Sequence, residues 1–161
     1  MAWAKNGTPN TLTGTADDCD ITDLTAYKFN VFLAHVIASG SIRIFENLNN
    51  NTNSVYAYRT SENGGADSTG TSQTKSNNNS VAGAGDDFIV QYLCSITGEE
   101  KLSIIYVVDQ QASGASTAPS RQETVRKFVP SPDADITRID LNNNHTGDYA
   151  VGTNLSALGT D

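Results

Sequence analysis

The chain has 161 residues and a formal net charge of −8; 37% of its residues are hydrophobic and 17% are charged. This length is typical of one domain, which can bury a core without help from disulfides or a structural metal. The negative charge repels phosphate groups and therefore argues against binding to nucleic acid or to anionic membrane surfaces.

Apolar residues recur with a period of two along much of the chain, and no segment sustains the spacing of an amphipathic helix. The candidate strands, in chain order, are residues 12–15, 19–22, 28–38, 41–47, 54–60, 71–75, 87–95, 101–108, 121–129 and 135–141. Segments rich in Asn, Gly, Ser and Thr separate them, and such residues favour turns. We therefore predict an all-β, single-domain, antiparallel β-sandwich, jelly-roll-like, with about eight to ten strands.

Two parts of this pattern predict more than a strand. Residues 28–38 are the most apolar segment and suit a central strand that is buried on both faces. Residues 87–95 and 101–108 alternate cleanly on either side of a short turn, which predicts a hairpin. Four side chains of each hairpin strand share one face: Phe88, Val90, Tyr92 and Cys94 in the first, and Leu102, Ile104, Tyr106 and Val108 in the second.

The two ends of the chain show a weaker pattern, so we divide it into an N-terminal arm (1–9), a β-sandwich domain (10–152) and a C-terminal tail (153–161). Residues 154–158 either close the sheet or belong to that tail. The free energy gained by burying Trp3, Leu155 and Leu158 is about equal to the backbone entropy cost of ordering these segments. We expect the three side chains to be assembly contacts with neighbouring chains, although Trp3 folding back onto its own domain is an equal alternative.

Motifs of catalysis or nucleotide binding are missing from the sequence, including GxSxG, HExxH, the P-loop and the dinucleotide fingerprint. His35 and His145 lie in unrelated segments, and nothing places either beside a nucleophile. Cys19 and Cys94 belong to no CxxC or Cys/His cluster, so we expect two free thiols. We expect no enzymatic activity and no cofactor.

Four carboxylates lie close together in sequence at Asp17, Asp18, Asp20 and Asp23, and oxygen donors of this kind can bind Ca²⁺. Their spacing is not that of an EF-hand loop, so a solvated turn is the simpler interpretation.

A second candidate site lies on residues 54–60, where Tyr56, Tyr58 and Arg59 could form a ligand face that stacks on a sugar or contacts a protein. Packing of the tyrosines on the opposite sheet is the alternative.

Several stretches resemble small virion-type proteins found among marine viral and phage-derived sequences. The stretches that carry the resemblance are residues 1–8, 23–26, 28–32, 96–102, 127–140 and 154–159. The resemblance implies a capsid-surface, decoration or tail protein, with copies of itself and other virion proteins as partners. No catalytic residues carry over from it.

The leading hypothesis is therefore a non-enzymatic viral structural protein that forms a homo-oligomer. It would be assembled in the host cytoplasm and located in the virion, which agrees with an N-terminal segment that lacks the apolar stretch of a signal peptide. The alternative is a carbohydrate-binding, lectin-like or receptor-binding module. A third possibility is a filament or matrix subunit.

Overall fold

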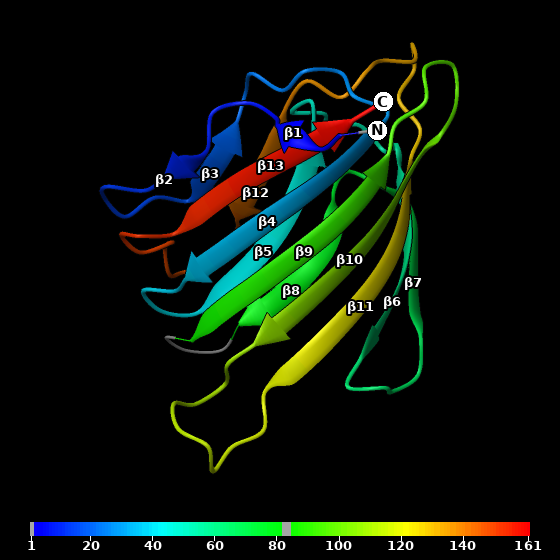
Figure 1. Ribbon diagram of the computed structural model, residues 1–161. Helices are drawn as coiled ribbons and strands as arrows, with labels where there is room; N and C mark the ends of the chain where they lie inside the picture. The colour runs from blue at the N-terminus through cyan, green and yellow to red at the C-terminus, as the bar shows by residue number, and fades with distance from the viewer. Residues whose placement is uncertain (1, 82–84) are drawn as a thin grey trace.

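Two antiparallel β-sheets pack face to face in the computed structural model, which describes residues 2–81 and 85–161 (Figure 1). The larger sheet lies in front in this view, and the smaller sheet lies behind it. The described residues form thirteen strands and no helix. The prediction of an all-β, antiparallel β-sandwich is confirmed.

The larger sheet has nine strands, in the order β1 (Ala4–Lys5), β13 (Asn154–Thr160), β4 (Phe29–Ile37), β9 (Asp86–Cys94), β10 (Lys101–Asp109), β11 (Ser120–Phe128), β6 (Tyr56–Glu62) and β7 (Ser68–Gln73), with β2 (Asn10–Thr11) also paired to β13. The smaller sheet has four strands, in the order β3 (Asp18–Ile21), β12 (Ile139–Asn143), β5 (Ile42–Leu48) and β8 (Ser76–Val81).

Most of the strands lie where the sequence places them, and β9 and β10 form the predicted hairpin. The strand total exceeds eight to ten because of the two-residue strand β1, because residues 61–81 hold both β7 and β8, and because the last residues form β13. Residues 12–15 are not a strand; the two-residue strand β2 comes just before them. Residues 82–84 of that long polar segment lie outside the described residues. The Asn-rich turn after β5 contains Asn49 and Asn50 in the left-handed conformation, with φ of 55° and 50°, which Asn tolerates better than most residues.

The core lies between the two sheets and is filled by alternate side chains of each strand. Its apolar half lies between β4, β13 and β9 on one side and β3, β12 and β5 on the other; there the inward side chains are mostly aliphatic. The expectation that β4 is buried on both faces is wrong. Its inward residues are buried, but its outward residues are only half-buried or exposed, because none of the described residues forms a second layer on that side of the sheet.

The C-terminal segment is a strand within the sheet, so the expected C-terminal tail (153–161) is not a tail. β13 pairs with β4 along its whole length and with β1 and β2 on its other side. Leu155 and Ala157 point into the core. Backbone hydrogen bonds on both edges, together with this burial, offset the ordering entropy that made a tail the expected state.

The N-terminal segment is also part of the domain. Ala4 and Lys5 pair with β13, and Asn6 is buried. The Asn6 side chain donates to Asn30 Oδ1 at 2.8 Å and accepts from the Thr25 backbone N–H at 2.7 Å. These contacts fix the chain from residue 4 onward to its own sheet, without a neighbouring molecule.

The other half of the core mixes apolar side chains, such as Ile105, Val107 and Phe128, with an ion pair that joins the two sheets. Arg126 of β11 donates to Glu46 Oε1 of β5 at 2.6 Å, and both side chains are almost completely buried. Arg126 also donates to the hydroxyls of Ser76 and Ser103, at 2.9 and 3.0 Å. Buried charges of this kind are tolerated when they are paired and hydrogen-bonded.

We expect Leu155→Ala to lower the free energy of unfolding by about 2–4 kcal/mol, because it leaves a cavity in the core. Leu158→Ala is the matched control in the same strand, since Leu158 points outward and is 39% exposed; it should cost less than about 1 kcal/mol. Urea denaturation at low protein concentration measures both values. Equal losses would mean that β13 does not sit in the register described.

Removal of one partner of the buried pair should be more costly than loss of an exposed pair. We expect Arg126→Met to lower the free energy of unfolding by about 3–5 kcal/mol, because it leaves the Glu46 carboxylate buried without its cation. Lys127→Met, next in the strand and paired with Glu100 at the surface, should cost at most about 1 kcal/mol. Denaturation of both variants, with Arg126→Met/Glu46→Leu as a rescue, tests this; no recovery in the double variant would contradict it.

Candidate functional site

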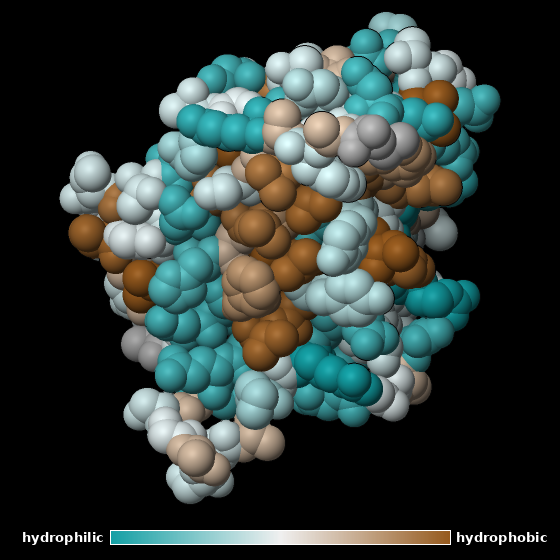
Figure 2. Space-filling model, viewed as in Figure 1, coloured by the Kyte–Doolittle hydropathy of each residue, from teal (hydrophilic) through white to brown (hydrophobic). Residues whose placement is uncertain are grey.

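The outward side of the larger sheet is the most unusual surface of the molecule, because its middle is apolar. The side chains there come from the outward positions of β13, β4, β9, β10 and β11, together with Trp3. We call this surface the apolar face, and its exposed members are Trp3, Phe88, Tyr92, Leu102, Ile104, Tyr106, Val108, Val125 and Leu158. Each of them is between 39% and 55% exposed. Figure 2 shows hydrophobic residues gathered in the middle of this face, with hydrophilic ones around them.

Strand register explains why these side chains meet. Phe88 lies opposite Val108, Tyr92 opposite Ile104, and Cys94 opposite Leu102 across the β9–β10 ladder. Ile104 in turn lies opposite Val125 on β11. Directly opposed residues of antiparallel strands place their side chains in contact on one face, so the alternation in the sequence becomes a continuous apolar surface.

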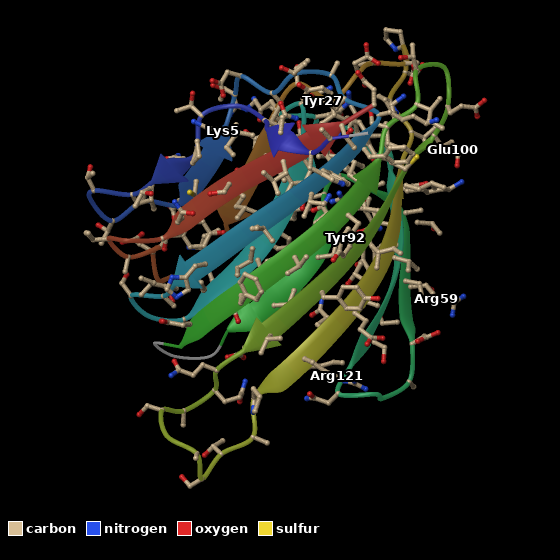
Figure 3. All side chains as sticks on the ribbon, in the orientation of Figure 1. Lys5, Tyr27, Arg59, Tyr92, Glu100 and Arg121 are labelled. Carbon is tan, nitrogen blue, oxygen red and sulfur yellow. The ribbon has the colours of Figure 1, made fainter. Side chains whose placement is uncertain are left out.

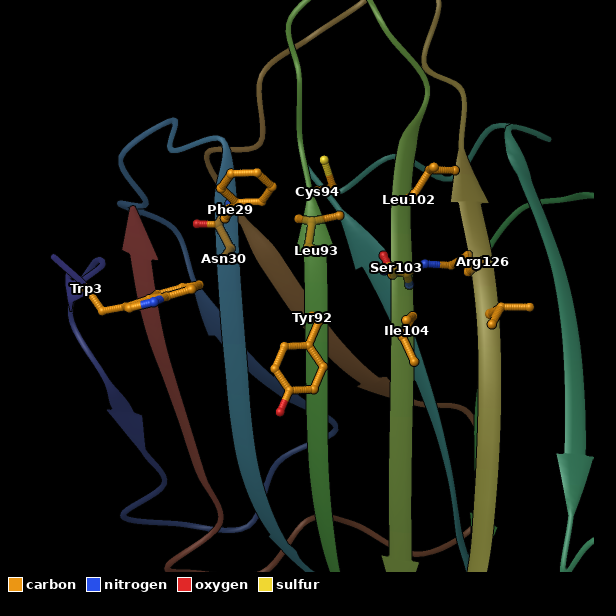
Figure 4. A pocket seen from close by; sticks show the side chains of 11 residues that line it. Trp3, Phe29, Asn30, Tyr92, Leu93, Cys94, Leu102, Ser103, Ile104 and Arg126 are labelled. Atoms are coloured by element: carbon orange, nitrogen blue, oxygen red, sulfur yellow. Dashed lines mark hydrogen bonds between the residues drawn. The ribbon is translucent and has the colours of Figure 1, made fainter. Parts of the chain in front are cut away.

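A hollow of about 500 Å³ lies at one end of the apolar face. Its outward-facing lining is formed by Trp3, Phe29, Tyr92, Cys94, Leu102, Ile104 and Val125. Figure 4 shows the Trp3 indole extending over β13 towards β4 and the Tyr92 ring standing on β9. Pockets of this size bind apolar groups in many proteins, and the side chains of this lining are almost entirely apolar.

Ion pairs lie around the apolar face. They are Arg59 with Asp67 at 2.9 Å, Lys127 with Glu100 at 3.1 Å, and Arg121 with Glu123 at 4.0 Å. His35 also contacts Asp86 at 3.1 Å, and Lys5 lies opposite Leu158 in the β1–β13 ladder. Figure 3 shows Tyr92 well inside the face, and Arg59, Arg121 and Glu100 towards its edge. The edge therefore carries both signs of charge, as the polar rim of a protein–protein interface does.

The outward side of the smaller sheet has the opposite character. Asp18, Asp20 and Asp140 are at outward positions of β3 and β12, and Arg138 is paired with both Asp20 and Asp140. Burial, followed by the charge of Asp140, raises the pKa of Asp20 to about 6. Burial also raises the pKa of Asp140, against the lowering effect of Arg138. This side therefore carries charges of both signs, since Arg43 also points outward from β5 and Lys75 lies over the Phe45 ring, whereas the middle of the opposite side of the sandwich is apolar.

The predicted calcium site is not formed. Asp23 accepts hydrogen bonds from the Thr8 N–H and hydroxyl at 2.8 and 2.7 Å, Asp17 accepts one from Asn143 at 2.9 Å, and Asp20 pairs with Arg138. Within residues 2–81 and 85–161, no group of three or more His, Cys, Asp or Glu side chains is placed to hold a metal ion. Alternation along β3 and the turns beside it directs these carboxylates to different partners.

The predicted ligand face at Tyr56, Tyr58 and Arg59 is not formed either. Tyr56 is buried between the sheets, stacked on Phe128, and its hydroxyl accepts from the Leu48 N–H at 2.9 Å. Tyr58 points the same way and lies against Gly70, where a Cβ would come within 2.6 Å of the Tyr58 ring. Arg59 points outward, to Asp67. The alternative of core packing holds for Tyr56.

The three residues expected to be assembly contacts do not lie on one surface. Trp3 and Leu158 lie on the apolar face, but Leu155 is only 1% exposed and belongs to the core. Trp3 folds back over its own sheet, which was one of its two alternatives, and leaves half of its surface exposed. The main members of the apolar face come from β9 and β10. Their alternation was visible in the sequence, but the sequence did not show which side of the hairpin the core would cover.

Both cysteines carry free thiols, and only one lies at the candidate site. Cys94 lines the hollow, whereas Cys19 is fully buried between the sheets. Burial raises the pKa of the Cys19 thiol to about 11, so this thiol stays protonated and unreactive at neutral pH. Nothing in the described part of the chain is a helix of the length and apolarity needed to cross a membrane.

Comparison with known proteins adds no relationship: no protein-family model, no curated protein and no solved structure matches this chain.

Stability should change with pH because of Asp20. Between about pH 4 and about pH 6 the folded chain holds a proton on Asp20 that the unfolded chain has lost, so this group's contribution to stability falls as the pH rises through that window. We therefore expect the free energy of unfolding of Asp20→Asn, measured relative to that of the wild type, to rise by about 2 kcal/mol from pH 4 to pH 7. Melting curves of the two proteins over this range measure the difference. Glu62→Gln, at an exposed position of β6, corrects for loss of one negative charge, and a constant difference for Asp20→Asn would contradict the expectation.

Proposed function

We propose that this chain is a non-enzymatic structural protein that works through protein–protein contacts, as a capsid-surface, decoration or tail component of a viral particle. The observation that carries the proposal is the apolar face. It presents nine exposed apolar side chains on one side of a sheet whose inward side is already satisfied by the core. Large contiguous apolar patches with a polar rim mark surfaces that are covered in the working state of a protein.

The apolar face favours protein contacts over sugar binding. Carbohydrates are bound by aromatic rings together with hydrogen-bonding groups that match their hydroxyls. Of the outward side chains that line the hollow, Tyr92 supplies a hydroxyl, Trp3 supplies an indole N–H, and the others are apolar or a thiol. A sugar placed there would leave most of its hydroxyls desolvated without partners, which is costly. The carbohydrate-binding alternative also loses the surface at Tyr56, Tyr58 and Arg59 on which it rested.

The viral setting comes from the resemblance of the sequence to virion proteins and agrees with the distribution of charge. The net charge of −8 suits a surface of a particle that faces water. A surface against packaged nucleic acid would instead favour basic side chains.

Particle fractionation tests this function directly. We expect the chain to co-sediment with nuclease-resistant particles from cells that produce it, and a tagged copy to be detected there by immunogold labelling. A tagged chain that carries Leu102→Glu should keep its fold but leave the particle fraction, because a charge is placed within the apolar face. Val151→Glu, at an exposed apolar residue in a turn outside that face, is the control. Recovery of the wild-type chain only in the soluble fraction would contradict the proposal.

A further inference from the structure

The area of the apolar face matches what a stable protein–protein contact needs. Its nine side chains expose on the order of 800 Å², taking about 150–250 Å² for a whole aromatic side chain. The largest apolar patch on an ordinary monomer is about 300–600 Å². A standard protein interface buries about 800 Å² on each partner. One partner that covers the whole face would therefore form a contact of normal size.

The distribution of charge identifies a second copy of this chain as a suitable partner. The net charge of −8 would drive two copies apart in most orientations. The nine members of the apolar face carry no charge, and ion pairs such as Arg59–Asp67 and Lys127–Glu100 place both signs of charge at its edge. The acidic cluster of Asp18, Asp20 and Asp140 lies on the opposite side of the sandwich. Contact through the two apolar faces therefore brings uncharged surfaces together and keeps these carboxylates of the two copies on the outer sides of the pair.

The shape of the face favours one arrangement of the two copies. The hollow lies at the Cys94–Leu102 end of the β9–β10 hairpin, and Phe88 and Tyr106 stand towards the other end of the same two strands. A two-fold axis that lies in the interface and runs across the strands reverses the strand direction of the second copy. It places Phe88 and Tyr106 of one copy over the hollow of the other, twice by symmetry.

We infer that the apolar face packs against the same face of a second copy about such a two-fold axis, an inference that rests on the proposed assembly function. The two larger sheets then face each other, and each hollow receives aromatic side chains from the opposite copy. Trp3 and Cys94 line the hollow and become buried in this dimer. Sheet faces pack on each other at about 10 Å with interdigitated side chains, so no change of the backbone is required.

Mass measurement identifies the surface. We expect light scattering of the full chain to give a dimer at micromolar concentration, and Leu102→Glu or Ile104→Lys to weaken dimerisation by at least about 100-fold, as for residues central to an interface. Both residues are about half exposed, so circular dichroism and the melting temperature at low concentration should remain close to those of the wild type. Val151→Glu should remain a dimer.

The chain contains its own reporters of this contact. Trp3 is the sole tryptophan, and its emission should shift to shorter wavelength as the protein concentration rises in the wild type but not in Leu102→Glu. Cys94 should react with a maleimide more slowly in the dimer than in Leu102→Glu, since Cys19 is fully buried and remains unreactive. Cys94→Ala gives the background of the labelling reaction.

Each outcome decides the inference separately from the proposed function. Loss of the dimer in Leu102→Glu, together with a concentration-dependent change at Trp3, supports it. A dimer that survives both Leu102→Glu and Ile104→Lys places the contact elsewhere and overturns it. A wild-type chain that stays monomeric also overturns it, including one whose hollow binds an apolar dye such as anilinonaphthalene sulfonate. In either of those two cases, co-sedimentation with particles would still uphold the proposed structural function.

Discussion

The buried ion pair between Arg126 and Glu46 is the constraint on which the arrangement of the larger sheet depends. Its two members belong to different sheets and are held by Ser76 and Ser103. A charge placed between the sheets needs hydrogen-bonding neighbours, so the inward positions near it are polar. Because side chains alternate across a strand, the apolar residues between those positions point outward. A slip of one residue would bury the apolar set and expose the ion pair.

This constraint divides the sandwich into two unlike halves. Under β4 and β13 the interior is aliphatic, whereas under β10 and β11 it contains the polar network around Arg126. A buried ion pair contributes little net stability compared with apolar packing of the same volume. In this chain it has a different consequence, because it leaves Leu102, Ile104 and their neighbours available on the outer surface. The arrangement fits a protein whose outer sheet face is covered by a partner.

Strand β13 fixes the positions of both chain ends. It inserts the C-terminal residues between β4 and the N-terminal strands β1 and β2, so both ends of the chain lie in one region of the larger sheet (Figure 1). Trp3 is carried by the N-terminal strand to the edge of the hollow, close to β9 and β10. The apolar face is thus built from segments that are far apart in the sequence, and its shape depends on the whole fold.

The amino-acid sequence alone determined the fold class, most strand positions and the β9–β10 hairpin, because period-two alternation and Asn- and Gly-rich turns are local signals. It also showed that Leu102, Ile104, Tyr106 and Val108 share one face. Only the tertiary structure decided that this face is the outer one, that the last residues form a strand within the sheet, and that Tyr56 is buried. It also decided that Asp17, Asp20 and Asp23 interact with three different partners. Those outcomes depend on contacts between distant segments, such as Arg126 with Glu46 and β13 with β4. A local pattern identifies the two faces of a strand, but only the packing of the two sheets decides which face is buried.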